Sequence, residues 1–137
     1  MILQVNTDGG SKGNPGPAAI GVVAYFDKKI LFKLRDDIGV ATNNDAEYQA
    51  VIAAYKKLSI INDQLSKVEK IEFNSDSQLL VNQLNGLYKV KNGRIREYIM
   101  QIRILEAEIK IPVSYQHITR EKNQVADDLV NNLDIGN

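Results

Sequence analysis

The chain changes its hydrophobic pattern several times, and each change predicts a new element. Apolar residues that alternate weakly at 2–7 predict a strand, and β-rich runs at 19–26 and 29–38, joined by the short turn "DKK", predict a hairpin. Alternation returns in "VEKIEFNSDS", where we expect the strand to stop at Asp76, and again in "VSYQHI". These runs together predict the strands of one sheet.

Helical spacing of apolar residues occurs in the segments between these strands. We expect a helix from 43 to about 60, with Asn and Asp residues at its start that can cap it, and a short helix at 78–84. A long apolar stripe at 95–109 predicts a third helix, which Pro112 would end. The last helix is expected from about Asn123, and its predicted inward side consists of Val125, Leu129, Val130 and Leu133.

The order of these elements predicts the fold class. A hairpin followed by helix, strand, helix and strand favours an α/β fold with a mixed sheet. The crossover through the first helix should be right-handed, and it should place the strand that ends at Asp76 beside the first strand. The 137 residues, with 44% hydrophobic content, suffice for one core. We therefore expect a single domain over 1–137.

The composition limits which partners and metal ions the protein is expected to bind. Lys plus Arg number 17 and Asp plus Glu number 17, so binding of nucleic acid would depend on local basic patches. The sequence has no cysteine and one histidine, so any metal ion would be held by oxygen ligands. The first residues lack the features of a secretion signal, and no apolar run approaches the roughly 20 residues that span a bilayer. We expect a soluble, cytoplasmic protein without a membrane partner.

Four acidic residues stand at positions where acids are unusual. Asp8 follows the first strand and Asp76 ends a later one, and ligands of open α/β sheets gather at such strand ends. Glu47 lies at the edge of the buried face of its helix, and Asp127 lies on the apolar side of the last helix. Each acid taken alone is explained as a turn residue, a cap or an acid in the first turn of a helix.

Taken together, the four acids predict a metal site. Carboxylates that converge on one edge of a sheet repel one another unless divalent cations neutralise them, and sites made only of carboxylates favour Mg²⁺ or Mn²⁺. Two such ions about 3.5 to 4 Å apart can activate a water and stabilise the leaving oxygen in phosphodiester hydrolysis. The expected cofactor is therefore a pair of Mg²⁺ or Mn²⁺ ions in each active site.

Four motifs, each with one of these acids, occur in a recognisable order: "TDGGSKGNPGPAAIG", "TNNDAEYQA", "SDSQLLVNQL" and "REKNQVADDL". In this order they closely resemble the type 1 branch of the ribonuclease H family, and the resemblance covers nearly the whole chain. It implies a ribonuclease H-like fold, with a five-stranded mixed sheet of order 3-2-1-4-5 and helices on both faces. It also implies cleavage of the RNA strand of RNA/DNA hybrids, which leaves 5′-phosphate and 3′-hydroxyl ends.

The resemblance assigns roles to particular residues. Asp8 would bridge both ions, Asp127 would hold the ion that activates the water, and Glu47 and Asp76 would hold the ion near the leaving group. Short amides and backbone groups suit the 2′-hydroxyl of RNA, which both donates and accepts a hydrogen bond. The matching positions are Ser11, Gly13, Asn14, Asn43, Asn44 and Gln78. Thr42, together with Asn14, would hold a phosphate of the DNA strand.

The chain departs from well-studied bacterial members in two places. The basic, aromatic-rich insertion after the third acid is missing, and the stretch without acids that holds Lys89, Lys91, Arg94 and Arg96 is the expected contact with the duplex backbone. His117 is expected on a strand, whereas many relatives carry a histidine on a mobile loop at the corresponding place. We keep His117 and Arg120 as auxiliary candidates.

Two other functions remain open at this point. The chain could be a module that grips hybrids without cutting them, although none of the four acids is lost. It could also be another two-metal nuclease on the same fold, such as an integrase or a resolvase, although the set of Asn residues suited to the 2′-hydroxyl argues against this. The expected partner is an RNA/DNA hybrid duplex, bound by a monomer.

Overall fold

Five strands pair in the order β3-β2-β1-β4-β5, which confirms the order expected from the sequence. The computed structural model describes residues 1–132. β1 pairs antiparallel with β2 and parallel with β4, so the sheet is mixed. The bounds of the strands are Ile2–Ser11 for β1, Gly16–Phe26 for β2, Lys29–Ala41 for β3, Lys70–Ser75 for β4 and Val113–His117 for β5.

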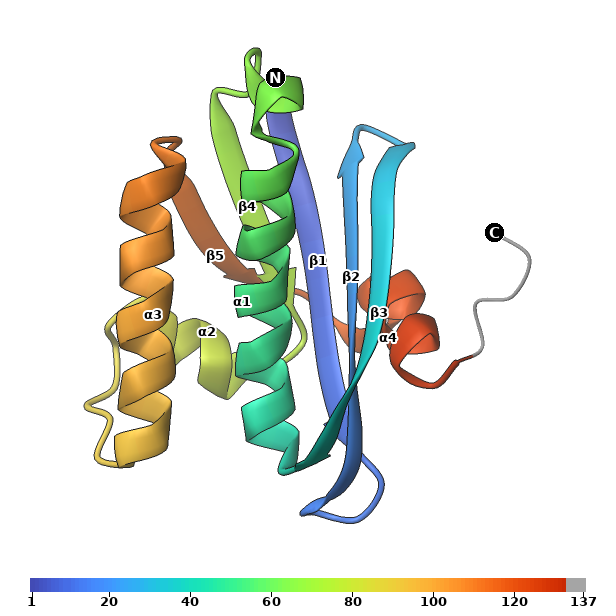
Figure 1. Cartoon of the computed structure of the whole chain (residues 1–137), viewed down its shortest axis with the longest axis vertical. Coiled ribbons are helices and arrows are strands. Elements are labelled where there is room, and N and C mark those ends of the chain that lie inside the picture. The colour runs from blue at the N-terminus through green and yellow to red at the C-terminus, as the bar shows by residue number, and fades with distance from the viewer. Residues whose placement is uncertain (133–137) are drawn as a thin grey trace.

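Helices cover both faces of this sheet, as Figure 1 shows: α1, α2 and α3 lie on one side and α4 lies on the other. None of the helices within residues 1–132 combines the length and the apolar character needed to cross a membrane. The α-helices are α1 (Asn43–Ile60), α2 (Gln78–Leu84), α3 (Gly93–Ile109) and α4 (Gln124–Val130), and the two 3-10 helices are η1 (Asn62–Leu65) and η2 (Arg120–Asn123).

The core lies between the sheet and the side covered by α1, α2 and α3. Leu3 and Val5 of β1 and Ile71 and Phe73 of β4 are buried in this core, because alternate side chains of a strand point to the same face. The polar residues between them pair across the strands: the Asn74 side-chain amide donates to the side-chain oxygen of Asn6 at 2.9 Å. This hydrogen bond ties β1 to β4 two residues before Asp8 and Asp76.

The structure corrects the expected end of the first strand. β1 continues to Ser11, because Gly9 and Gly10 pair with Ile20 and Ala19 of β2. Asp8 therefore lies within a strand rather than after one, and pairing with β2 holds its backbone on one side. The hairpin strands also extend past the predicted ranges, with β2 beginning at Gly16 and β3 ending at Ala41.

The structure also corrects the predicted face of the last helix. Ala126 and Leu129 are buried against the sheet, and Val130 is half-buried, whereas the Val125 side chain is 38% exposed. Neighbouring helical residues point about 100° apart, so a helix that buries Ala126 turns Val125 away from the sheet. Leu133, the remaining residue of that predicted face, lies outside the described residues.

Two glycines let helices approach the sheet closely on both sides of Asp8. A Cβ on Gly9 would overlap the backbone carbonyl of Ala46 and lie 2.6 Å from the Glu47 nitrogen, so α1 rests directly on β1 there. A Cβ on Gly21 would lie 2.5 Å from the Ala126 oxygen, so α4 rests directly on β2. Because Gly21 pairs with Asp8, both helices converge on the level of Asp8.

We predict that Gly9→Ala destabilises the fold by about 1–3 kcal/mol, because the added methyl group must push the backbone of α1 off the sheet. Chemical denaturation measures this free energy of unfolding. Gly10→Ala is the matched control, since its Cβ would meet only the Val130 Cγ1 at 3.5 Å and the Asn43 Oδ1 at 3.9 Å. If the two variants were equally stable, close packing of α1 on Gly9 would not matter.

Candidate metal centre

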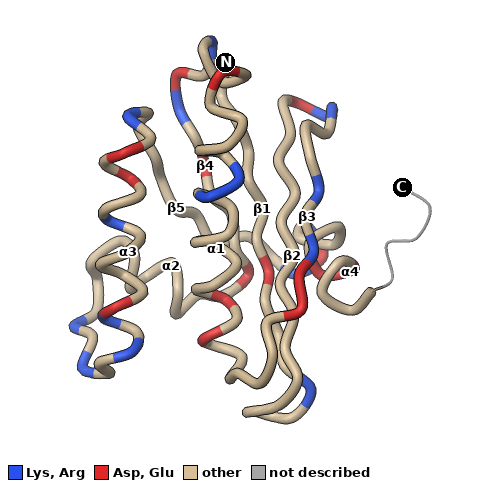
Figure 2. Tube along the Cα trace, viewed as in Figure 1, with Lys and Arg blue, Asp and Glu red and all other residues tan. Residues whose placement is uncertain are grey.

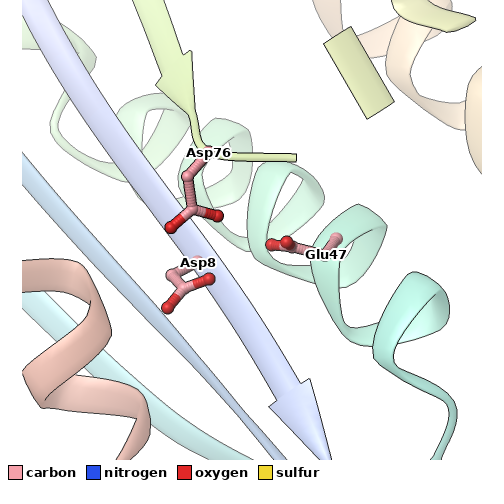
Figure 3. Close-up of side chains that lie close together, drawn as sticks. All are labelled: Asp8, Glu47 and Asp76. Carbon is pink, nitrogen blue, oxygen red and sulfur yellow. The ribbon is translucent and has the colours of Figure 1, made fainter. Parts of the chain in front are cut away.

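The strand register brings Asp8 and Asp76 together. β1 and β4 run parallel with Thr7 opposite Ser75. The residues that follow this pair are Asp8 and Asp76. Figure 3 shows their carboxylates side by side where β4 ends and the chain turns toward α2. Parallel pairing thus places two carboxyl groups within 4.8 Å of each other, which confirms that these two predicted acids meet.

Glu47 reaches the same point from the first turns of α1. Its Oε1 accepts a hydrogen bond from the Gly9 backbone nitrogen at 2.9 Å, so the residue beside Asp8 orients this carboxylate. One carboxylate oxygen of each of Asp8, Glu47 and Asp76 lies within 4.8 Å of the others, which matches the convergence seen in Figure 3. Three acids that are far apart in the sequence therefore form one cluster.

Asp127 approaches from α4 on the other side of the sheet. Its carboxylate lines the same open cavity as the three clustered acids, a space of about 500 Å³. Asp127 Oδ1 lies 3.4 Å from Nη2 of Arg120 and 3.3 Å from Nδ2 of Asn131. All four acids predicted from the sequence thus face one cavity, and the fourth is held by two neighbouring donors.

Burial and mutual repulsion make these acids hard to ionise. Loss of solvent raises the pKa of Asp8 to about 8, and the charges of Asp76 and Asp127 add to this effect. Burial also raises the pKa of Glu47 well above its ordinary value, with further contributions from Asp8 and Asp76. A strained group of carboxylates is the arrangement that a divalent cation relieves.

The donors suit hard cations. All of the convergent groups are carboxylates, and no histidine or cysteine joins the cluster within residues 1–132. Mg²⁺ and Mn²⁺ prefer carboxylate and water oxygens, whereas softer metals prefer nitrogen and sulfur. The residues present therefore fit a hard divalent cation such as Mg²⁺ or Mn²⁺.

Several predicted substrate residues form one hydrogen-bonded network beside the acids. The Asn43 Oδ1 accepts from the Ser11 backbone nitrogen at 2.9 Å, and Ser11 Oγ donates to the Gly13 carbonyl at 2.7 Å. Asn14 Oδ1 accepts from the Asn43 backbone nitrogen at 2.9 Å, so this network joins the β1–β2 loop to α1. Ser11 and Asn43 also line the cavity that holds the acids.

Thr42 has a structural task that the sequence did not assign to it. Its hydroxyl caps α1 by accepting from the Asp45 nitrogen at 3.0 Å, and the Asp45 carboxylate accepts from the Thr42 nitrogen at 3.2 Å. Asp45, one of the Asn and Asp residues expected to cap this helix, thus takes part in a reciprocal cap with Thr42. Asn44 is half-buried in the first turn that this cap orders.

Gln78 stands two residues after Asp76, at the exposed start of α2, and its amide donates to the Asn82 Oδ1 at 3.2 Å. It does not line the cavity that holds the acids. Ser77 caps α2 by accepting from the Leu80 nitrogen at 3.2 Å. Gln78 is therefore presented on a separate surface next to the third acid.

The basic stretch lies at the start of α3. Figure 2 shows basic positions gathered on the loop that leads into this helix and on its first turn. Lys89, Lys91 and Arg96 are exposed, whereas the Nε of Arg94 lies 2.7 Å from the Oδ1 of Asp45, a buried acid of α1. Arg94 therefore helps to hold α3 against α1, a use that the sequence did not predict.

The two auxiliary candidates differ in position. His117 is the exposed last residue of β5, as expected for a strand histidine, and it is not among the residues that line the cavity. Arg120, in contrast, lines the cavity and pairs with Asp127. Arg35 and Asn131 also line the cavity, although nothing in the sequence singled them out, because β3 and the end of α4 meet only in the folded chain.

Known proteins resemble this chain over most of its length. A family model described as reverse transcriptase-like matches residues 6–133. The ribonuclease HI of Halobacterium salinarum is 38% identical over 125 residues, which cover 90% of this chain and 60% of that protein. The bifunctional protein Rv2228c of Mycobacterium tuberculosis is 34% identical over 135 residues, which cover 96% of this chain and 35% of that protein. The chain thus spans only about a third of this longer relative.

Solved structures agree with these matches. LC11-RNase H1, isolated from compost by a metagenomic approach, has a TM-score of 0.89 and 42% identity, with 96% of this chain and 94% of that chain covered. The same protein in complex with an RNA/DNA hybrid has a TM-score of 0.89 and 41% identity, with 95% and 94% covered.

The sheet order and the acids gathered at one end of it define a protein with a ribonuclease H-like fold. The chain belongs to the ribonuclease H family, in its type 1 branch.

Burial of Asp8, together with repulsion from the neighbouring acids, predicts how stability depends on pH. Asp8 has an ordinary pKa of 3.8 and a pKa of about 8 in the folded protein, so between these values the folded state keeps a proton that the unfolded state has released. The contribution of Asp8 to stability is therefore complete below about pH 4 and is lost as the pH rises to about 8.

We predict that Asp8→Asn raises the melting temperature of the metal-free protein at pH 7, because the neutral amide avoids the free-energy cost of protonating Asp8 on folding at that pH. Mg²⁺ should stabilise the parent more than the variant, since it binds the assembled site. Thermal melts in a chelator and in millimolar Mg²⁺ measure both effects. A variant that melts below the parent in the chelator would show instead that Asp8 acts as a structural hydrogen-bond acceptor.

Proposed function

We propose that this chain is an endoribonuclease that hydrolyses the RNA strand of RNA/DNA hybrids and leaves 5′-phosphate and 3′-hydroxyl ends. The observation that carries the proposal is the convergence of Asp8, Glu47 and Asp76 within 4.8 Å, with Asp127 in the same cavity. The similar LC11-RNase H1 has been solved with an RNA/DNA hybrid bound, which supports the choice of substrate.

We propose that the four acids hold two divalent cations, Mg²⁺ or Mn²⁺. Asp8, at the centre of the cluster, would contact both ions, with Asp127 on one side and Glu47 and Asp76 on the other. Bound ions of this kind supply the charge that activates a water and stabilises the leaving oxygen of a phosphodiester. The Gly9 nitrogen orients the Glu47 carboxylate, and Arg120 and Asn131 orient the Asp127 carboxylate. These proposed metal ligands are therefore held in position before any ion binds.

Recognition of RNA would rest on the network beside the acids. The hydroxyl of Ser11 and the amide of Asn43, which line the cavity, and the backbone at Gly13 would contact 2′-hydroxyl groups of the RNA strand, and Asn14, Asn44 and Gln78 would complete this proposed set of contacts. Amides can donate and accept, as the 2′-hydroxyl does, and a deoxyribose offers neither function. Thr42 and Asn14 would bind a phosphate of the DNA strand through the start of α1.

Residues farther from the acids would have supporting roles. Lys89 and Lys91 would contact the duplex backbone from the loop before α3, and Arg120 and His117 would act only as auxiliary residues. We propose a monomer and a cytoplasmic location. The proposal of a nuclease is preferred to that of a hybrid-binding module without nuclease activity, because Asp8, Glu47 and Asp76 lie within 4.8 Å of one another and Asp127 lines the same cavity.

We predict that Asp8→Asn and Asp76→Asn each reduce cleavage of a labelled hybrid in Mg²⁺ by about a hundredfold or more, since the loss of a metal ligand removes several kcal/mol of transition-state stabilisation. Gel analysis of the labelled RNA strand measures the rate and the product ends. Asp36→Asn, an exposed acid on β3, is the control and should cut like the parent.

The choice of substrate separates the rival functions. The parent should cut the hybrid but not a DNA duplex. It should also leave intact a stretch of deoxyribose nucleotides placed inside the RNA strand. Binding of the hybrid without cleavage in Mg²⁺ or Mn²⁺ would favour the binding module. Equal cutting of a DNA duplex would favour another two-metal nuclease.

We predict that the double variant Lys89→Ala with Lys91→Ala weakens hybrid binding for all sequences alike, because interactions with phosphates carry no sequence information. The slope of log affinity against log salt should fall by about one for each lysine–phosphate interaction that the variant removes. Binding titrations at several salt concentrations measure this slope. An unchanged slope would mean that these lysines are solvated residues of a loop.

A further inference from the structure

α4 carries Asp127, and the position of this short helix depends on its packing against the rest of the protein. It has seven residues, Gln124–Val130, and isolated helices of this length are unstable in water. Its packing on the sheet therefore decides how far the Asp127 carboxylate lies from Asp8. Three groups outside the four acids fix that packing, and each acts on a different part of the helix.

Asn123 fixes the first end of the helix. Its side chain is fully buried, and its Nδ2 donates to the Thr7 carbonyl at 2.9 Å. Thr7 is the residue before Asp8, so the start of α4 is tied to the strand that carries the central acid. Gly21 then lets the middle of α4 lie directly on β2.

Arg35 fixes the last turn of the helix. Its Nε donates to the Leu129 carbonyl at 2.8 Å, and its Nη1 pairs with the Asp37 Oδ1 at 3.0 Å. Basic side chains commonly bind the last carbonyls of a helix in this way. The pairing register places Arg35 opposite Gly21, which is itself opposite Asp8, so Arg35 stands level with the acids.

The last turn of α4 is connected to the carboxylate of Asp127. The Asn131 backbone nitrogen donates to the Asp127 carbonyl at 3.1 Å, and its side-chain amide donates to the same carbonyl at 3.0 Å and to Asp127 Oδ1 at 3.3 Å. A shift of the turn that Arg35 holds would therefore move Asn131 and the acid that Asn131 orients.

We propose that Arg35 is a positioning residue of the metal site: it holds the last turn of α4 on the sheet and thereby keeps the carboxylate of Asp127 beside Asp8. This inference rests on the proposed function, because it takes Asp127 as a metal ligand. Arg35 does so through the geometry of its guanidinium, with one nitrogen on α4 and another on Asp37.

A simpler role for Arg35 is that of a cation beside a cluster of acids. Lysine separates the two roles, because it keeps the positive charge but lacks the rigid fork that binds two partners at once. Arg35→Met removes both the charge and the fork. Lys56→Met, which removes an exposed cation from α1, is the matched control.

The experiment measures the half-saturating Mg²⁺ concentration of the site, obtained by fitting the rise in melting temperature against Mg²⁺ concentration, so it requires no nuclease activity. Arg35→Met and Arg35→Lys should both raise this concentration by about tenfold, the size typical for loss of a residue that orients a metal ligand. Lys56→Met should match the parent. In an Asp127→Asn background, Arg35→Met should cause no further change, because the two residues act as one unit.

Three results would overturn the inference. Arg35→Lys with the Mg²⁺ dependence of the parent would show that charge alone matters. A lower melting temperature for Arg35→Met at an unchanged half-saturating Mg²⁺ concentration would show a purely structural role. A full effect of Arg35→Met in the Asp127→Asn background would show that Arg35 acts through another group. If Mg²⁺ fails to stabilise the parent itself, the proposed metal site falls, and this inference falls with it.

Discussion

The structure depends on the direct contact of two helix backbones with neighbouring strands at the level of Asp8. At Gly9 and Gly21 no side chain separates the sheet from α1 and α4. This contact brings Glu47 and Asp127 to Asp8 from opposite faces, while parallel pairing of β1 and β4 adds Asp76. Larger residues at the two glycines would move both helices outward, and the acids would then separate.

The fold must hold these acids together against their own repulsion. Neutral or positive groups contact Glu47 and Asp127, and side-chain amides join the strands that lead to Asp8 and Asp76. The amides of Asn6 and Asn74 join the two strands that carry Asp8 and Asp76, and Arg120 pairs with Asp127. The site is thus assembled before a cation arrives, which reduces the ordering needed when one binds.

Most of the elements could be predicted from local patterns, because period and capping are properties of short segments. The predictions were wrong where strand pairing or helix packing decided the end of an element or the direction of a side chain. β1 continues through Asp8 to Ser11 because β2 pairs with the glycines that follow, and a run of small residues gives no sign of such pairing. Val125 points outward because Ala126, one residue later, is the residue that fits over Gly21.

The sequence by itself determined the order of the elements, the four acids and the oxygen-only character of any metal site, since these follow from residue type and spacing. Tertiary structure alone decided the distances among the acids and the raised pKa of Asp8, because burial and repulsion exist only once distant segments meet. It also decided the roles of Arg35, Arg94 and Asn123, whose partners lie 94, 49 and 116 residues away. Contacts over such separations leave no local pattern, so only the folded chain reveals them.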